Sequence, residues 1–478
     1  MILNMFAMVG LGAFRSISQF VLNLALAFFL SPADLGVISF VLPFVVLFGM
    51  MAESGLTSAI VKERAVSADV SGAALVICIF FGIIGASIII GLLDSPLGAI
   101  EHPDTSWVFY VSALVLLLCV VPIVPRALME RLLQYRKVAQ IEAFASVTAL
   151  VICLAIAVSG GGTYALLAYH VSLQSFRCFG FLLKTPAAIV PNFRLGQALP
   201  LYRVGIWSLL SNLMSLVPRQ FDKVFIGWHL GAATLGLYAF AYQIMLLPLV
   251  VVTWPVSGVL YASLVRTTDS AARAAVVRAV FQLTSVVLFP GMAFISIGLD
   301  FPVRQVLPEN WHDVPSILAY LGWVGAVHAI TSYTGAVLMS VGAFRAQFLI
   351  VLANTLATIA VLVTLLPSGM DAYLLGYLVQ SASFGLAVLV GMCIVAQLRI
   401  VAVFQSLAAG AFAAAGGTLV YVAVGNLVKL DGGEGLRWGI QAMSFAAVFL
   451  ATLATVWRDL VASAQILRRP VVSHDSTT

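Results

Sequence analysis

Runs of apolar residues that are long enough to form transmembrane helices recur along the whole chain, with short polar stretches between them. A helix that crosses the hydrocarbon core of a membrane needs about 20 predominantly apolar residues. The runs that meet this length lie at 5–30, 35–60, 70–93, 105–128, 140–159, 162–183, 202–228, 234–262, 275–299, 314–340, 346–366, 371–397, 400–428 and 436–460. This pattern predicts an all-α polytopic membrane protein with about 14 transmembrane helices.

One of these runs, 202–228, carries a polar stripe although the rest of it is apolar. The stripe residues recur at spacings of three and four, which places them on one face of a helix. They are Ser208, Ser211, Asn212, Ser215, Arg219, Asp222 and Lys223. An ionised side chain at the bilayer centre costs about 2.5–3.5 kcal/mol, so such residues face protein or water rather than lipid. We therefore expect this helix to form one wall of a hydrated, positively charged cavity.

The composition supports a membrane protein and argues against an enzyme. Of the 478 residues, 62% are hydrophobic and 9% are charged, whereas soluble domains carry roughly 25% charged residues. The predicted loops are short, so no extramembrane domain is large enough for a catalytic site. The five cysteines lie inside apolar runs without a CxxC pair, which favours packing over disulfide formation or metal binding. We expect neither a metal nor a cofactor.

The basic residues are distributed asymmetrically over the predicted loops. With the N-terminus in the cytoplasm, 17 of the 24 Lys and Arg residues fall on the cytoplasmic side. Four lie within spans, and three fall on the opposite side, namely Arg304, Lys429 and Arg437. Because cytoplasmic loops are rich in Lys and Arg, this distribution predicts a multi-pass protein with both termini in the cytoplasm.

The chain contains an internal repeat. A shift of 200 residues aligns Leu30, Ala33, Leu35, Gly36 and Phe40 with Leu230, Ala233, Leu235, Gly236 and Phe240. A shift of about 208 aligns Leu166, Leu167, Tyr169 and Val171 with Leu374, Leu375, Tyr377 and Val379. Six spans separate the copies, an even number, so the two halves run in the same direction. We predict two pseudo-symmetric six-helix bundles at 1–200 and 201–398, two additional transmembrane helices at 399–462 and a cytoplasmic tail at 463–478.

The repeat places a second polar seam at the height of the first. In its register, three polar residues of the first predicted helix overlay the stripe described above; they are Arg15, Gln19 and Asn23. Arg15 has no acidic residue within one turn and lies well inside its run, so we favour cavity lining over snorkelling to an interface. Two such walls facing each other would enclose one central site.

The charged residues of the stripe allow two interpretations. Arg219, Asp222 and Lys223 either form an ion-pair cluster that neutralises itself, or their two cations leave a surplus positive charge for an anionic substrate. We favour the surplus. Phosphate or diphosphate would suit it, because guanidinium and ammonium groups form charge-assisted hydrogen bonds with phosphate oxygens. Asp222 either holds Arg219 in place, which we favour, or exchanges a proton or Na⁺.

Other polar and aromatic residues within the spans are less specific. Tyr238, Tyr242, Trp254 and Tyr261 crowd the eighth predicted helix, where aromatic rings either stack on sugars or mark a membrane interface. Arg177 lies near the cytoplasmic end of its helix, and we expect it to snorkel to that interface.

Two groups of short strings resemble the polysaccharide transporter family. The first comprises 125–131 (PRALMER), 135–137 (YRK) and 141–142 (IE), and the second comprises 219–223 (RQFDK), 226–227 (IG), 235–238 (LGLY) and 241–242 (AY). This family contains the Wzx-type flippases of bacterial exopolysaccharide and lipopolysaccharide assembly. It belongs to the multidrug/oligosaccharidyl-lipid/polysaccharide exporter superfamily, together with lipid II flippases and MATE drug exporters.

The resemblance implies a flippase of the bacterial inner membrane that moves undecaprenyl-diphosphate-linked oligosaccharides to the periplasmic leaflet by alternating access. It implies two six-helix bundles around a cationic cavity, and it carries over most directly to Asp222 and Arg219. The diphosphate would then rest on Arg15, Arg219 and Lys223. No nucleotide-binding loop is present in the sequence, so a coupling ion, H⁺ or Na⁺, would supply any energy needed.

Two alternative functions stay open at this point. A MATE-like ion-coupled efflux pump for small molecules would favour an acid-lined cavity, whereas the charges within these spans are mostly basic. An intramembrane glycan polymerase or ligase would need a large periplasmic loop with catalytic side chains, and no such loop is predicted. We expect membrane lipids as partners and no nucleic acid, with the polysaccharide polymerase machinery as a further candidate partner.

Overall fold

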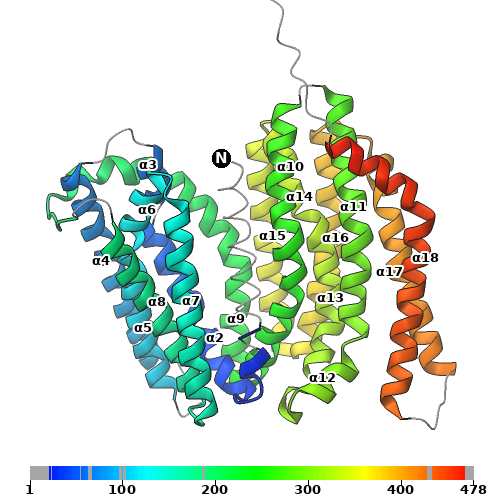
Figure 1. Ribbon diagram of the computed structural model, residues 1–478, viewed down its shortest axis with the longest axis horizontal. Coiled ribbons are helices and arrows are strands. Elements are labelled where there is room, and N and C mark those ends of the chain that lie inside the picture. The colour runs from blue at the N-terminus through cyan, green and yellow to red at the C-terminus, as the bar shows by residue number, and fades with distance from the viewer. Residues whose placement is uncertain are drawn as a thin grey trace, which may run out of the picture. The chain divides into compact units, whose positions relative to one another are not determined.

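The computed structural model describes residues 21–22, 24–53, 55–62, 67–95, 100, 104–185, 189–267, 269–427 and 433–468 (Figure 1). Every regular element in these ranges is a helix, which confirms the predicted all-α class. The chain divides into two compact units, Met1–Ala239 and Phe240–Thr478. The bundle boundaries drawn from the repeat stay a prediction.

Within the described ranges, 11 helices are long and apolar enough to cross a membrane, so the chain is a polytopic membrane protein. Gln220–Arg266 is 47 residues long, enough for two crossings at about 20 residues each. Three predicted spans have no counterpart of their own among the 11, and most of the first, 5–30, lies outside the described residues, which begin at residue 21. The span 162–183 forms α8, whose polar residues lower its mean hydropathy, and 202–228 lies within a longer helix. The total of 14 therefore stays a prediction.

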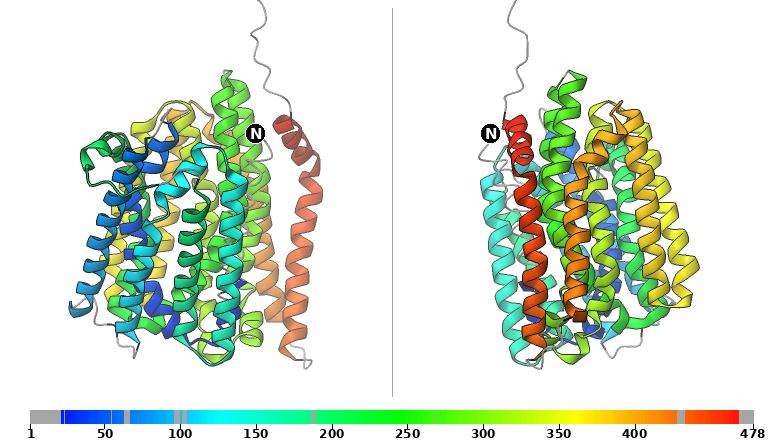
Figure 2. Two further views of the ribbon diagram at one scale, coloured as in Figure 1. Left: turned by 60° about the vertical axis from the view of Figure 1, so that its left-hand side comes forward. Right: turned by 90° about the vertical axis from the view of Figure 1, so that its right-hand side faces the viewer.

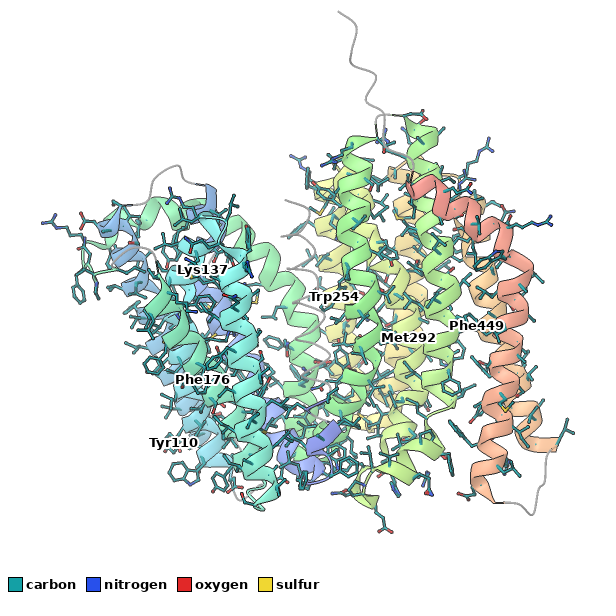
Figure 3. The ribbon with its side chains drawn as sticks, in the orientation of Figure 1. Tyr110, Lys137, Phe176, Trp254, Met292 and Phe449 are labelled. Atoms are coloured by element: carbon teal, nitrogen blue, oxygen red, sulfur yellow. The ribbon has the colours of Figure 1, made fainter. Side chains whose placement is uncertain are left out.

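The first unit is a set of helices that run lengthwise beside one another (Figure 1). They are α2 (Pro32–Glu53), α3 (Leu56–Lys62), α4 (Ala68–Gly91), α5 (Thr105–Val120), α6 (Ile123–Arg131), α7 (Tyr135–Val158), α8 (Thr163–Lys184) and most of α9 (Leu199–Pro248), with short 3₁₀ turns at Leu92–Asp94 and Leu195–Gln197. Helix α5 packs against α2, α4 and α8, and α7 packs along α8. Tyr110 of α5 and Lys137 of α7 lie in opposite halves of this unit (Figure 3).

The second unit contains the end of α9 and the helices that follow it. These are a π-helical turn (Leu249–Thr253), α10 (Trp254–Arg266), α11 (Ser270–Ile297), α12 (Asp300–Val306), α13 (Val314–Thr331), α14 (Tyr333–Ser340), α15 (Phe344–Leu365), α16 (Met370–Val395), α17 (Ile400–Leu427) and α18 (Glu434–Arg468), with 3₁₀ turns at Glu309–Trp311 and Leu366–Ser368. The last two helices pack against each other and against α11, as the right-hand view of Figure 2 shows for α17 and α18.

The two units repeat the same packing order. In the first unit α3 packs on α6, α4 on α5, α5 on α8 and α7 on α8. In the second unit α10 packs on α14, α11 on α13, α13 on α16 and α15 on α16, in the same succession. The corresponding fourth spans are interrupted alike, between α5 and α6 and between α13 and α14. This agreement supports the internal repeat predicted from the sequence.

The turn after the fourth span recurs in both units with the same hydrogen bonds. The Leu133 N–H donates to the Glu130 carbonyl at 2.9 Å, and the Gly342 N–H donates to the Met339 carbonyl at 3.1 Å. The residue that donates this bond has a left-handed backbone conformation in both turns, with φ of 56° at Leu133 and 76° at Gly342. Glycine adopts this conformation freely, whereas a residue with a Cβ atom pays roughly 1–2 kcal/mol. The first unit therefore holds a strained leucine where the second has glycine.

Helix α2 packs against residues 232–236 of α9, which belong to the first unit, and the two helices contact each other reciprocally. A Cβ atom on Gly36 would lie 1.8 Å from the Ala232 carbonyl oxygen, and one on Gly236 would lie 1.7 Å from the Pro32 carbonyl oxygen. Residue 36 thus meets 232, and residue 236 meets 32, which is the pattern of a local two-fold axis. Small residues permit such close approach of membrane helices. The contact supports the predicted shift of 200 residues.

Arg177 is buried in an ion-pair network, so the expectation that it snorkels is wrong. Its Nη2 atom lies 2.6 Å from Glu142 Oε1, and only 9% of the residue is exposed. Arg126 bonds Glu130 at 2.7 Å and approaches Glu142 at 3.6 Å. The strings that carry the family resemblance therefore link α6, α7 and α8. The sequence of α8 does not reveal this partner of Arg177, because Glu142 lies on α7.

Replacing Glu142 with alanine is expected to destabilise the protein by about 3–5 kcal/mol, because it leaves the buried Arg177 guanidinium without its carboxylate. The matched control is Asp300→Ala, which breaks the exposed Arg304–Asp300 pair on α12 and should change stability little, because water already solvates both charges. Thermal unfolding of both detergent-purified variants measures the difference. Equal melting temperatures for the two variants would contradict the buried network.

Candidate functional site

Helix α9 is broken at Gly231 into two arms, residues 199–230 and 232–248. Gly231 has φ 82° and ψ 173°, a backbone conformation that glycine adopts without strain. On a straight helix, residues 16 positions apart would lie about 24 Å from each other, yet Asp222 and Tyr238 are hydrogen-bonded across the break. The two arms therefore fold back on each other. This confirms the break predicted between the runs 202–228 and 234–262.

Asp222 joins the two arms. Its carboxylate accepts a hydrogen bond from the Tyr238 hydroxyl at 2.6 Å and another from the Lys223 backbone N–H at 2.7 Å. Asp222 is 4% exposed and Tyr238 is completely buried. A buried carboxylate is tolerated only where donors replace its water, and here one donor comes from each arm. Asp222 therefore acts as a clamp that holds the two arms together. Its hydrogen bond with Tyr238 was not predicted from the sequence.

Lys223 lies beside this clamp and is half-buried. Its ammonium donates to Gln220 Oε1 at 3.3 Å, and its charge attracts the Asp222 carboxylate. One acid and one base thus offset each other at this point of the first arm. A surplus of positive charge would have to come from Arg219 and Arg15.

Several residues predicted for the site lie outside the part of the chain that the structure describes. These are Arg15, Gln19 and Asn23, together with the side chain of Arg219. Tyr242 is described and is 6% exposed. Of the four aromatic residues singled out in this region, Trp254 and Tyr261 are the more exposed, at 42% and 38%. The proposed substrate contacts of all these residues stay predictions.

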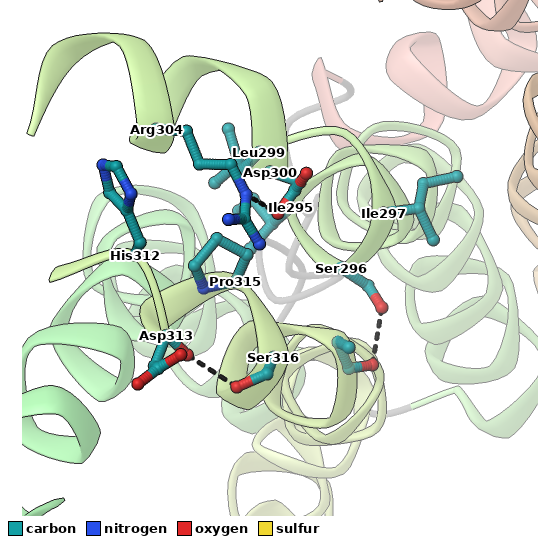
Figure 4. A pocket seen from close by; sticks show the side chains of 11 residues that line it. Ile295, Ser296, Ile297, Leu299, Asp300, Arg304, His312, Asp313, Pro315 and Ser316 are labelled. Carbon is teal, nitrogen blue, oxygen red and sulfur yellow. Dashed lines mark hydrogen bonds and ion pairs between the residues drawn. The ribbon is translucent and has the colours of Figure 1, made fainter. Parts of the chain in front are cut away.

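A pocket of about 280 Å³ opens in the second unit between the end of α11, α12 and the start of α13 (Figure 4). Its charged lining consists of Asp300, Arg304 and Asp313, beside His312. The 2.9 Å hydrogen bond from Arg304 to Asp300 raises the pKa of that guanidinium. With two carboxylates to one arginine, this pocket carries no surplus positive charge and does not suit a diphosphate.

A second pocket, of about 370 Å³, lies in the first unit around the break in α9. Its lining is Ala33, Ile100, Gly227, Trp228 and residues 230–233, which provide apolar side chains and backbone. Among the described residues, no group of three or more His, Cys, Asp or Glu is arranged to hold a metal ion. The arms of α9 therefore carry the charged candidate site.

Sequence comparisons relate the chain to proteins of bacterial polysaccharide synthesis. A family model described as "Polysaccharide biosynthesis protein" matches residues 25–316. The succinoglycan biosynthesis transport protein ExoT of Rhizobium meliloti (strain 1021) is 28% identical over 294 residues, 60% of this chain and 58% of ExoT. The teichuronic acid biosynthesis protein TuaB of Bacillus subtilis (strain 168) is 27% identical over 265 residues, 52% of this chain and 53% of TuaB. These matches span little more than half the length of either relative.

Two solved structures share the fold. The lipid II flippase MurJ in an inward closed conformation has a TM-score of 0.73 and 14% sequence identity, covering 96% of this chain and 100% of that chain. An inward-facing multidrug resistance MATE family transporter of the MOP superfamily has a TM-score of 0.60 and 16% identity, covering 80% and 99%. The chain therefore has the fold of this superfamily of transporters.

Proposed function

The chain belongs to the polysaccharide biosynthesis protein family, and from this premise we propose that it is a flippase for undecaprenyl-diphosphate-linked oligosaccharides. It moves these lipids across the bacterial inner membrane for exopolysaccharide or lipopolysaccharide biosynthesis. The observation that carries the proposal is the family match over residues 25–316. The fold shared with the lipid II flippase and the transport protein among the relatives support the same conclusion.

The proposed mechanism follows from the charge of the substrate. A diphosphate cannot enter the hydrocarbon core alone, because removing its charge from water is too costly. Arg219, Lys223 and Arg15 would form charge-assisted hydrogen bonds with its oxygens, while the glycan occupies a hydrated cavity and the prenyl tail stays in lipid. The Asp222–Tyr238 bond supports this role, because it fixes the turn of α9 that carries Lys223. Alternating access would carry the headgroup across, driven by H⁺ or Na⁺ if coupling is required.

The MATE-like alternative shares the fold but fits the charges less well. A pump for cationic compounds requires acidic residues to face its substrate, whereas the in-span charges Arg15, Arg219 and Lys223 are basic. The one acidic residue of the stripe, Asp222, is buried and bonded to Tyr238. We therefore favour an anionic substrate.

Arg219→Ala and Arg15→Ala are each expected to abolish polymer export while the protein stays in the membrane, because each removes a cation proposed to contact the diphosphate. Export by a strain that depends on the gene measures the effect, with immunoblots of the membrane fraction alongside. The control is Arg304→Ala, an exposed residue of α12, which should leave export unchanged. Normal export by both variants would remove the site assignment.

A further inference from the structure

The turn between α6 and α7 exposes two leucines at one end of the first unit. Leu132 is 48% exposed and Leu133 is 67% exposed. Leu133 has the left-handed φ of 56°, at the position where the matching turn of the second unit has Gly342. The leucine is unfavourable for folding at this position, because its side chain packs little and its backbone is strained. Local stability therefore does not favour leucine at this position.

Basic residues follow these leucines directly. Arg136 and Lys137, in the first turn of α7, are both exposed. Cations at the start of a helix interact unfavourably with its dipole, so this placement also does nothing for the helix itself. Apolar and basic side chains therefore point outward together from one short segment.

The linker 189–199 adds a second segment of the same character. Its backbone lies against the start of α4, where a Cβ atom on Gly72 would be 1.9 Å from the Val190 carbonyl oxygen. Three of its apolar side chains nevertheless point outward, with Val190 66%, Phe193 82% and Leu199 61% exposed, and Arg194 is exposed as well. The linker follows the end of α8, and Figure 1 places it at the end of the unit where α3 and α6 lie.

We propose that these two segments bind the anionic phospholipid surface of the membrane. The lipid-binding surface comprises Leu132, Leu133, Arg136, Lys137, Val190, Phe193, Arg194 and Leu199. Its apolar side chains enter the boundary between headgroups and acyl chains, and its cations contact lipid phosphates. Interfacial segments combine apolar and basic residues in this way, and anionic leaflets attract basic residues that flank transmembrane helices.

The placement of the surface favours lipid over a protein partner. The first segment joins two helices that are long and apolar enough to span the membrane, Thr105–Arg131 and Tyr135–Val158. The second segment follows α8 at the same end of the unit (Figure 1), so we place both segments at the level of the headgroups. Exposed leucine, valine and phenylalanine would otherwise face water at this point. The proposal depends on the chain spanning the membrane, and it is independent of the transported substrate.

The test uses full-length protein that carries an environment-sensitive fluorophore on Leu132→Cys, reconstituted in lipid nanodiscs. The wild-type protein treated in the same way gives the background from its five native cysteines. Nanodiscs of phosphatidylcholine alone are compared with nanodiscs that also contain phosphatidylglycerol. We expect the anionic lipid to shift the emission to the blue and to increase quenching by lipids with a spin label near the headgroup. Added salt should reverse this effect.

Two variants in the same reporter background separate the contributions of the surface. Arg136→Ser with Lys137→Ser should abolish the dependence on phosphatidylglycerol. Leu133→Gly copies the turn of the second unit, so it should reduce lipid quenching while the melting temperature stays equal or rises. A reporter at Ser159→Cys, in the turn between α7 and α8, should show no dependence on anionic lipid. Equal access of aqueous iodide to the Leu132→Cys reporter in both lipids would overturn the proposal, as would full retention of the lipid dependence after loss of both cations.

Discussion

Gly236→Ala is expected to destabilise the protein by about 3 kcal/mol or more, enough to lower its amount in the membrane several-fold. The new Cβ atom would lie 1.7 Å from the Pro32 carbonyl oxygen. Because that atom belongs to the backbone of α2, no side chain can rotate away, and the two helices must separate. Gly36→Ala should have the same effect, since it meets the Ala232 carbonyl oxygen at 1.8 Å.

The control for this prediction is Gly391→Ala. Gly391 lies inside α16 with open space around its Cα atom, so alanine should leave stability unchanged or raise it by up to about 1 kcal/mol. Thermal unfolding in detergent and the amount of protein in membranes measure all three variants. If Gly236→Ala behaved like Gly391→Ala, α2 and α9 could not cross as closely as the structure has them.

Tyr238→Phe is expected to cost about 1.5–3 kcal/mol, because it removes one of the two donors to the buried Asp222 carboxylate without changing the shape of the ring. Asp222→Ala should cost at least as much, since it removes the acceptor of the 2.6 Å hydrogen bond from the buried Tyr238 hydroxyl and the negative charge beside Lys223. Both variants should also reduce polymer export, because the arms of α9 are then no longer clamped.

This pair of variants distinguishes a clamp from a substrate contact at Asp222. Tyr238 is completely buried, so it acts on transport only through the residues that it positions. If Asp222 is a clamp, Tyr238→Phe should show part of the export defect of Asp222→Ala. Asp222→Asn should export more polymer than Asp222→Ala, because its amide oxygen can still accept the hydrogen bond from Tyr238. Normal export and stability in Tyr238→Phe, together with loss of export in Asp222→Ala, would contradict the clamp.

The features of the fold that the sequence predicts well are periodic or local. The apolar runs predicted the positions of the helices. The five matched positions from Leu30 to Phe40 predicted a repeat with a shift of 200 residues, which aligns Gly36 with Gly236. In the structure each of these glycines contacts the helix that carries the other. Phe40 packs on Phe109 at 6.4 Å between ring centroids, and Phe240 packs on Trp311 at 4.9 Å, which follows the same repeat.

The features that the sequence did not predict are contacts between helices. The Asp222–Tyr238 bond joins the predicted runs 202–228 and 234–262, and the break at Gly231 brings these two runs together. Arg177 was misplaced for the same reason, because its partner Glu142 lies on a different helix. The strain at Leu133 is invisible in composition, since a backbone angle becomes known only from the structure. These features depend on tertiary structure, and the local sequence pattern does not predict them.

The most direct test of the proposed function is translocation in proteoliposomes of a fluorescently labelled undecaprenyl-diphosphate-linked oligosaccharide. The wild-type protein should move the lipid between leaflets. The double variant Arg219→Ala with Lys223→Ala should be slower by at least about tenfold, because each lost charge-assisted hydrogen bond is worth about 1.5–3 kcal/mol. The two preparations are compared at equal amounts of folded protein, because Lys223 also lies beside the buried Asp222 carboxylate. Equal rates for the two proteins would contradict recognition of the diphosphate by these cations, and no movement by the wild-type protein would contradict the flippase itself.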